Sequence, residues 1–147
     1  MTKAPLLDTH AWIWWINGDR QLPPDVSTAL DELPAEARPL LSDISLWEVA
    51  MLVTLDRLRL TVPLDQWLQR AADPRAVRIL PITPAVALEV TRLPTAFRRD
   101  PADRVIVATA RAHNCPVITR DRAILRSGLV KAWTPAAPPS DRTSSRG

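Results

Sequence analysis

Four acidic residues stand at the starts of predicted helices, and their carboxylates are the side chains of this sequence best suited to chemistry. Asp8 follows the apolar stretch PLL, Glu48 lies in SLWEVAML, Asp103 lies in RRDPADRVIVATARA, and Asp121 ends VITRD. Carboxylates that are packed together repel one another, and a hard divalent cation relieves this repulsion. Oxygen ligands favour Mg²⁺ or Mn²⁺ over zinc. Such a site supports phosphodiester hydrolysis, because the ion polarises the phosphoryl oxygen and generates hydroxide from bound water.

Two of these four acids, and Asp100 beside a third, also have a structural explanation as helix caps. Asp8 suits the N-cap of a helix that begins at Thr9, and Asp121 suits the N-cap of a short helix that follows it. Asp100 suits the N-cap of a helix that starts at Pro101, which explains Asp103, at the N3 position, only in part. Capping and chemistry are compatible in one residue, so both alternatives stay open.

Glu48 has two alternative explanations of its own. Ser45 and Glu48 form the S-x-x-E pattern of a capping box. If the helix instead begins near Ser42, Glu48 is a charged residue on an apolar, core-facing stripe. That stripe consists of Ile44, Leu52 and Leu55. Burial of an ion without a partner is costly, so the second alternative favours a functional site.

The elements that must position these acids alternate between strands and helices. Strands are predicted at residues 4–7, 38–42, 76–83, 116–119 and 129–133. Helices are predicted at residues 9–17, 23–33, 44–58, 63–73, 83–93, from Pro101 onward and at 120–128. This alternation predicts an α/β fold with a central parallel sheet that is covered on both faces. In such a sheet the four acids converge on one edge, beyond the carboxyl ends of the strands.

Composition limits the class of protein. The 147 residues predict one domain over residues 1–133 and a disordered Pro/Ser-rich tail over residues 134–147. The net charge of +3 permits an anionic partner but does not identify one. A single cysteine, Cys115, excludes an internal disulfide and a cysteine zinc site. Without a signal-peptide pattern or a run of membrane-spanning length, we expect a soluble cytoplasmic protein.

Four ordered stretches resemble the acidic signatures of PIN-domain ribonucleases, specifically the VapC-type toxins of bacterial toxin–antitoxin pairs. They are LLDTHAWIWW, SLWEVAML, RRDPADRVIVATARA and VITRD, and the resemblance runs from about Leu6 to Trp133. The resemblance implies a PIN-like three-layer α/β/α domain and Mg²⁺- or Mn²⁺-dependent endonucleolytic cleavage of RNA, with transfer RNA or ribosomal RNA as the substrate. It also implies a homodimer and a VapB-type antitoxin that blocks the site.

By this resemblance the active-site acids are Asp8, Glu48, Asp103 and Asp121. We expect the metal ion to be held by Asp8 and Asp103, while Glu48 and Asp121 complete the acidic cluster. Asp100 is an additional acid of the D-P-x-D-R pattern, and Thr119 matches a hydroxyl residue that supports the cluster. The sequence does not identify the residues that bind substrate.

Basic and aromatic residues near the acids have several alternative roles. The five nearby arginines either grip RNA phosphates, neutralise acids or lie in solvent. They are Arg98, Arg99, Arg104, Arg120 and Arg122. His10 is expected at the helix surface, and neither His113 nor Cys115 is expected to be catalytic.

The six tryptophans are expected to serve packing rather than base stacking. One ring of Trp12 or Trp15 is expected in the core, and Trp14 in a subunit or antitoxin contact. Trp47 and Trp67 are predicted to be core residues. Trp133 is predicted to close the last strand.

Two other functions are alternatives to the nuclease. A phosphotransfer domain of receiver or haloacid-dehalogenase type also places an Asp after its first strand. Here the position two residues after Asp8 is His10, and Lys131 is the only late lysine, which counts against both types. The second alternative is a non-catalytic interaction module that has kept the PIN fold.

Overall fold

A short parallel sheet forms the centre of the molecule. A computed structural model describes residues 3–97 and 100–135. The strands are β1 (Leu6–Leu7), β2 (Leu40–Ser42), β3 (Arg78–Leu80) and β4 (Val117–Ile118), in the spatial order β3-β2-β1-β4. Leu6 is in register with Leu40 on one side and with Val117 on the other. The chain order therefore reverses at β1, since β2 and β3 extend the sheet one way and β4 pairs on the opposite side.

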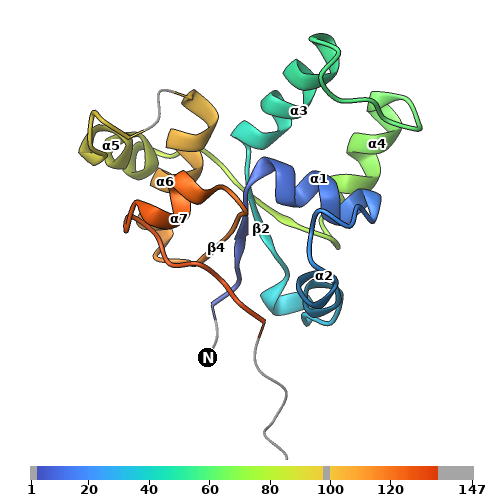
Figure 1. Cartoon of the computed structure of the whole chain (residues 1–147), viewed down its shortest axis with the longest axis horizontal. Helices are drawn as coiled ribbons and strands as arrows, with labels where there is room; N and C mark the ends of the chain where they lie inside the picture. The colour runs from blue at the N-terminus through green and yellow to red at the C-terminus, as the bar shows by residue number, and fades with distance from the viewer. Residues whose placement is uncertain (1–2, 98–99, 136–147) are drawn as a thin grey trace, which may run out of the picture.

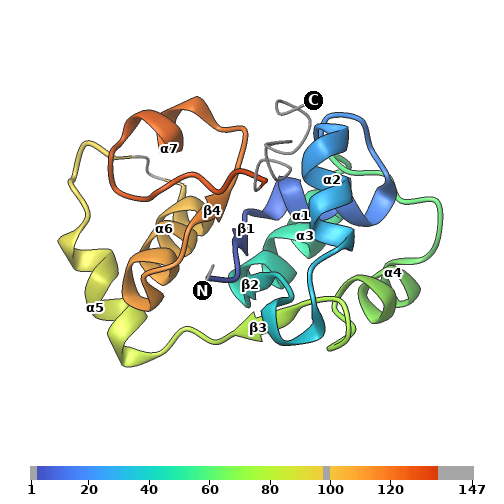
Figure 2. The same ribbon diagram turned by 90° about the horizontal axis from the view of Figure 1, so that it is seen from below.

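Helices cover both faces of this sheet. The helices α1 (Thr9–Asn17), α2 (Pro24–Asp31), α3 (Ile44–Thr54) and α4 (Leu64–Ala71) lie on one side, as Figures 1 and 2 show. The helices α5 (Pro84–Arg92), α6 (Pro101–His113) and α7 (Arg122–Arg126) lie on the other, and a 3-10 turn occupies Ala35–Ala37. The predicted three-layer α/β/α fold is confirmed.

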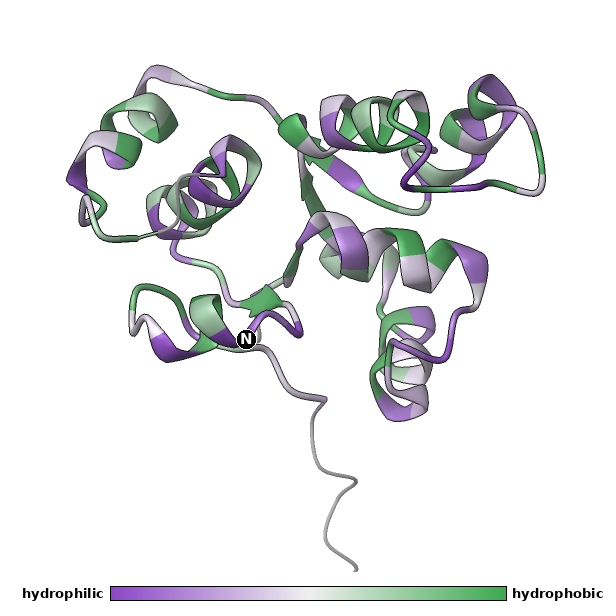
Figure 3. Cartoon of the chain, turned by 45° about the horizontal axis from the view of Figure 1, so that its top comes forward, coloured by the Kyte–Doolittle hydropathy of each residue, from purple (hydrophilic) through white to green (hydrophobic). Residues whose placement is uncertain are grey.

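Alternation of side chains along the strands divides the core between the two faces. Leu7, Leu41 and Ile118 belong to a cluster that also contains Trp12 and Trp67. The neighbouring positions Leu6 and Val117 pack with Ile106 of α6 instead. In Figure 3 the strands are mostly hydrophobic in colour, with a hydrophilic band in one of them, and further hydrophilic segments lie on the outer helices. The middle of α6 is buried over residues 106–110, whereas its last turn, residues 111–113, is exposed.

Helix α3 turns the predicted face only partly toward the core, since Ile44 and Leu52 are partly buried against core clusters. Its buried residues are Ser45 and Val49, whereas Leu55, assigned to the core-facing stripe, is 52% exposed. Trp47 was predicted to be a core residue and is 49% exposed, so that prediction is wrong as well. Helix α3 contacts α1, α4 and α6. Ser45 bonds Thr9 of α1, and Val49 packs in the core cluster that contains Trp12 and Trp67.

The last predicted strand is reduced to a single bridge. Val117 pairs in parallel with Ala132, and the Trp133 amide donates to the Val117 carbonyl at 2.9 Å. Most of the predicted tail, residues 136–147, lies outside the described residues. Among the described residues, no helix combines the length and apolar character needed to cross a bilayer.

Candidate active site

One pocket of about 340 Å³ brings the predicted acids together. The nine residues that line it come from three helices and from the loops that lead into α1, α6 and α7. They are Asp8, Thr9, His10, Trp14, Glu48, Asp100, Asp103, Arg120 and Asp121. All four acids named from the sequence, together with Asp100, therefore face a common space although 113 positions separate the first from the last.

The order of the strands explains this convergence. Asp8 directly follows β1, and Asp121 follows β4 by a short turn. Because β1 and β4 are neighbours in a parallel sheet, both loops leave the same edge, at the point where the strand order reverses. Helix α3 follows β2 and carries Glu48, while the first turn of α6 supplies Asp103.

Three of the acids cap helices in addition to lining the pocket. In each of them one carboxylate oxygen, Oδ1, accepts hydrogen bonds from backbone amides of the first turn. The bonds run from Ala11 to Asp8 at 2.7 Å, from Ala102 and Asp103 to Asp100 at 2.9 and 3.2 Å, and from Ala123 to Asp121 at 2.9 Å. The predicted caps are confirmed, and capping fixes each carboxylate at the entrance of its helix.

Asp8 is the most buried acid of the pocket. Its exposed fraction is 7%, and this burial raises the pKa of its carboxyl above the ordinary value of 3.8. The Thr119 hydroxyl and the Ala11 amide lower the pKa of Asp8, as does the charge of His10. The negative charge of Asp121 raises the pKa of Asp8 further, by less than burial does.

Glu48 does not take part in the capping box that its spacing suggests. The residue before α3 is Asp43, and the Ser45 hydroxyl bonds the Thr9 hydroxyl at 2.9 Å rather than a backbone amide of its own helix. Burial raises the pKa of Glu48, the nearby Thr9 hydroxyl opposes this, and the charge of Asp100 adds to it. Within the described chain, the Oε1 atom of Glu48 is buried without a hydrogen-bond partner.

Thr119 lies behind the acids rather than in the wall of the pocket. Its hydroxyl accepts a hydrogen bond from the Asp121 amide at 2.9 Å, and the same hydroxyl lowers the pKa of Asp8. It thereby links the loops that follow β1 and β4.

The donor set fits a hard divalent cation in type and charge. Five carboxylates line the pocket, and a buried carboxylate oxygen of Glu48 lacks a partner in the described chain. Yet no three Asp, Glu, His or Cys side chains within residues 3–97 and 100–135 are gathered closely enough to hold an ion as they stand. Ionised carboxylates repel one another, and the three capping acids are drawn toward helix amides, which accounts for the open arrangement.

The structure also brings residues to the pocket that the sequence did not assign to it. Thr9 and Trp14 line it, and His10, expected at the helix surface, is exposed at its edge. Arg120 lines it too, and its Nη1 atom donates to the Gln21 carbonyl at 2.6 Å. In the sequence, only proximity to the acids of the motifs indicated that these residues could lie at the site. The orientation of each helix decided which of their side chains face the pocket.

The other arginines flanking the acids differ in role. The guanidinium of Arg104 donates to the carbonyls of Val90, Pro94 and Phe97, so it holds backbone together. Arg122 is exposed. Arg98 and Arg99 lie outside the described residues.

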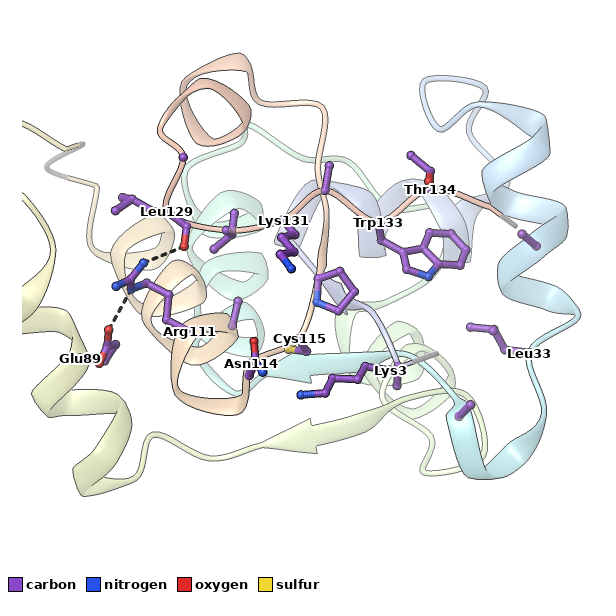
Figure 4. A pocket seen from close by; sticks show the side chains of 18 of the residues that line it. Lys3, Leu33, Glu89, Arg111, Asn114, Cys115, Leu129, Lys131, Trp133 and Thr134 are labelled. Carbon is purple, nitrogen blue, oxygen red and sulfur yellow. Dashed lines mark hydrogen bonds and ion pairs between the residues drawn. The ribbon is translucent and has the colours of Figure 1, made fainter. Parts of the chain in front are cut away.

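A second, larger pocket of about 960 Å³ lies at the opposite, amino-terminal ends of the strands. Figure 4 shows it, with Arg111 joined to Glu89 and to the Leu129 carbonyl. It contains none of the acids predicted to be catalytic, although Lys131 and the buried Cys115 line it. Volume alone would favour this larger pocket as the active site, whereas the placement of the titratable side chains favours the smaller one.

Comparison with known proteins agrees with this architecture. Residues 6–128 match the model of the PIN domain. The chain belongs to the PIN-domain family. It is 39% identical over 122 residues to "Ribonuclease VapC22" of Mycobacterium tuberculosis, covering 81% of this chain and 88% of that protein. The resemblance to VapC-type PIN domains predicted from the four acidic stretches is thus confirmed.

Solved structures show the same PIN fold. The complex VapBC2 from Rickettsia felis, bound to a promoter DNA fragment, has a TM-score of 0.66 at 17% identity, covering 88% of this chain and 97% of that one. FitAcB from Neisseria gonorrhoeae has a TM-score of 0.62 at 27% identity and covers 88% of this chain and 96% of that one. A toxin–antitoxin complex from Klebsiella pneumoniae has a TM-score of 0.62 at 23% identity, with 92% and 100% covered.

Proposed function

We propose that this VapC-type PIN-domain protein is a Mg²⁺- or Mn²⁺-dependent endoribonuclease and acts as the toxin of a toxin–antitoxin pair. The observation that carries the proposal is the convergence of Asp8, Glu48, Asp103 and Asp121 on one pocket at the switch point of the sheet. The relative of 39% identity is named a ribonuclease, which supports the same activity here.

The chain's own residues divide the work as follows. Asp8 and Asp103 would hold the divalent ion, which would supply polarisation of the phosphoryl oxygen and activation of water. Glu48 and Asp121 orient the attacking water, and the unpartnered Oε1 of Glu48 accepts a hydrogen bond from it. Asp100 caps α6 and so holds Asp103 at the pocket, while Thr119 links the loops that carry Asp8 and Asp121.

The proposed partners follow from membership of the VapC group. The substrate is RNA, with transfer RNA or ribosomal RNA as the class that the sequence resemblance implies. A VapB-type antitoxin blocks the acid pocket in the resting complex. The active form is a homodimer in the cytoplasm.

The phosphotransfer alternative is disfavoured by the position of Lys131. That lysine lines the large pocket at the opposite end of the strands, away from the acids. A receiver-type site needs a lysine close to the Asp that follows the first strand. The non-catalytic module is distinguished from the nuclease by the following assay.

The test is cleavage of purified RNA by the full chain in Mg²⁺ or Mn²⁺, with a chelator as the metal-free control. Asp8→Asn should abolish cleavage and keep the fold, because Asn is as good an N-cap as Asp. Asp65→Asn is the matched control, since Asp65 also lies in the first turn of a helix but is exposed outside the pocket. Full activity of Asp8→Asn, or cleavage unaffected by the chelator, would overturn the proposal. Sequencing the new RNA ends after brief induction in cells identifies the RNA that is cut.

A further inference from the structure

Trp14 and His10 form an aromatic wall of the acid pocket. They are four positions apart on α1 and therefore share one helix face. Their ring centroids are 5.9 Å apart and their planes meet at 49°. Both residues line the pocket that contains the acids, and both are accessible, since His10 is exposed and Trp14 is only partly buried.

The other tryptophans of α1, and Trp67 of α4, make hydrogen bonds within the protein. The indole N–H groups of Trp12, Trp15 and Trp67 donate to protein oxygens. The acceptors are the Ala71 carbonyl at 2.9 Å, Asp31 at 2.9 Å and Asn17 at 2.8 Å. Trp14 makes no such bond within the described residues. Trp14 packs against the core cluster and also lines the pocket, so the core supports a ring that stays partly accessible.

The same pocket contains a permanent cation. Arg120 is exposed, and its hydrogen bond to the Gln21 carbonyl at 2.6 Å holds the guanidinium beside the acids. Guanidinium groups suit phosphate oxygens. A rigid aromatic face, a guanidinium and a group of metal-binding acids thus share a space of about 340 Å³.

We propose that Trp14 and His10 form a stacking site for one unpaired base of the RNA, next to the phosphate that is cut, and that Arg120 contacts a neighbouring phosphate. The inference rests on the proposed ribonuclease function and adds to it a binding site for one base of the substrate. An aromatic face accepts any base, but only a base that is not already stacked in a duplex. Recognition at this position therefore requires an unstacked base and is tolerant of its identity.

The experiment uses a series of short single-stranded RNA oligonucleotides in which one nucleotide at a time lacks its base. With the wild-type chain, loss of the base at one position beside the cut should lower kcat/KM by roughly 5- to 150-fold, the range of a lost aromatic–base stack. Trp14→Ala should lower kcat/KM on the intact oligonucleotide by a similar factor and should be insensitive to base removal at that position. Trp14→Phe keeps an aromatic face and should keep most of the sensitivity.

Trp47→Ala is the matched control, because Trp47 is 49% exposed and does not line the pocket. It should behave as the wild type throughout. The inference is overturned if Trp14→Ala retains the full penalty at that position. It is also overturned if Trp14→Ala changes only inhibition by the antitoxin, which would assign the aromatic wall to a protein partner.

Binding of the same oligonucleotides in Ca²⁺, measured by fluorescence anisotropy, separates this inference from the proposed function. Base-dependent binding that is lost in Trp14→Ala supports the stacking site even if the wild type cleaves no RNA. Cleavage without any dependence on a base beside the cut contradicts the stacking site and leaves the ribonuclease proposal intact. Equal binding of intact and base-free oligonucleotides by a chain that does not cleave overturns both.

Discussion

Replacement of Thr9 by valine tests whether a buried hydroxyl pair holds the two halves of the acid pocket together. Thr9 follows Asp8 at the start of α1, and its Oγ1 lies 2.9 Å from Ser45 Oγ of α3, three residues before Glu48. Thr9 is 1% exposed and Ser45 is fully buried. Thr9→Val keeps the shape of the side chain but leaves the Ser45 hydroxyl without its partner. An unsatisfied buried polar group costs about 1–3 kcal/mol, so we expect a loss of about 2 kcal/mol in the free energy of unfolding.

Urea denaturation of a double-mutant cycle measures this interaction. Ser45→Ala should also destabilise, by about 1 kcal/mol or more, because it orphans the Thr9 hydroxyl. The double variant removes both polar groups, so its loss should be smaller than the sum of the single losses by about 1 kcal/mol. Thr54→Val is the control, since its exposed hydroxyl bonds only the Ala50 carbonyl of its own helix at 2.8 Å. That variant should stay within about 0.5 kcal/mol of the wild type.

The same variant has a consequence for cleavage. The Thr9 hydroxyl lowers the pKa of Glu48, so Thr9→Val should move the acid limb of the pH–rate profile to higher pH. Additive losses in the double-mutant cycle would show that the two hydroxyls are not coupled. A pH profile that does not move would show that Thr9 does not influence Glu48.

Three further predictions concern pH, packing and thiol reactivity. Burial raises the pKa of Asp8, so its ionised form destabilises the folded chain: the penalty is absent below the ordinary value of 3.8, where both states are protonated, and grows as pH rises through the folded pKa. With a chelator present, Asp8→Asn should therefore be more stable to urea than the wild type at pH 7 and equally stable near pH 3. A variant that is less stable than the wild type at pH 7 would contradict burial as the cause. Arg104→Ala should lower the free energy of unfolding by about 2 kcal/mol by removing charged donors from three carbonyls, while the exposed Arg122→Ala should have little effect in the same urea titration. Burial raises the pKa of the Cys115 thiol to about 11 from 9.0. At pH 8 its reaction with a disulfide reagent should therefore be about 100-fold slower in the folded chain than in urea. Equal rates in the two conditions would refute this prediction.

Local signals in the sequence determined the secondary structure. The helix predicted at residues 9–17 is found as Thr9–Asn17, because its cap, its apolar content and the Gly18 that ends it all act within a few residues. The D-P-x-D pattern likewise predicts the start of α6, where Asp100 caps and Pro101 occupies the first turn. The alternation of these elements was sufficient for the fold class and for the edge of the sheet on which the acids converge.

Only the tertiary structure decided which face each helix turns inward. The Ser45–Glu48 spacing suggested a cap, yet Ser45 bonds Thr9 of another helix, and the stripe assigned to the core around Glu48 ends in the exposed Leu55. Trp47, predicted to be a core residue, is exposed for the same reason, while the partly buried Trp14 lines the acid pocket. Helices α1 and α3 each have more than one apolar side. Which side becomes buried depends on contacts with residues 30 or more positions away in the sequence. Periodicity within one segment cannot encode that choice, because burial free energy is gained only where two surfaces meet.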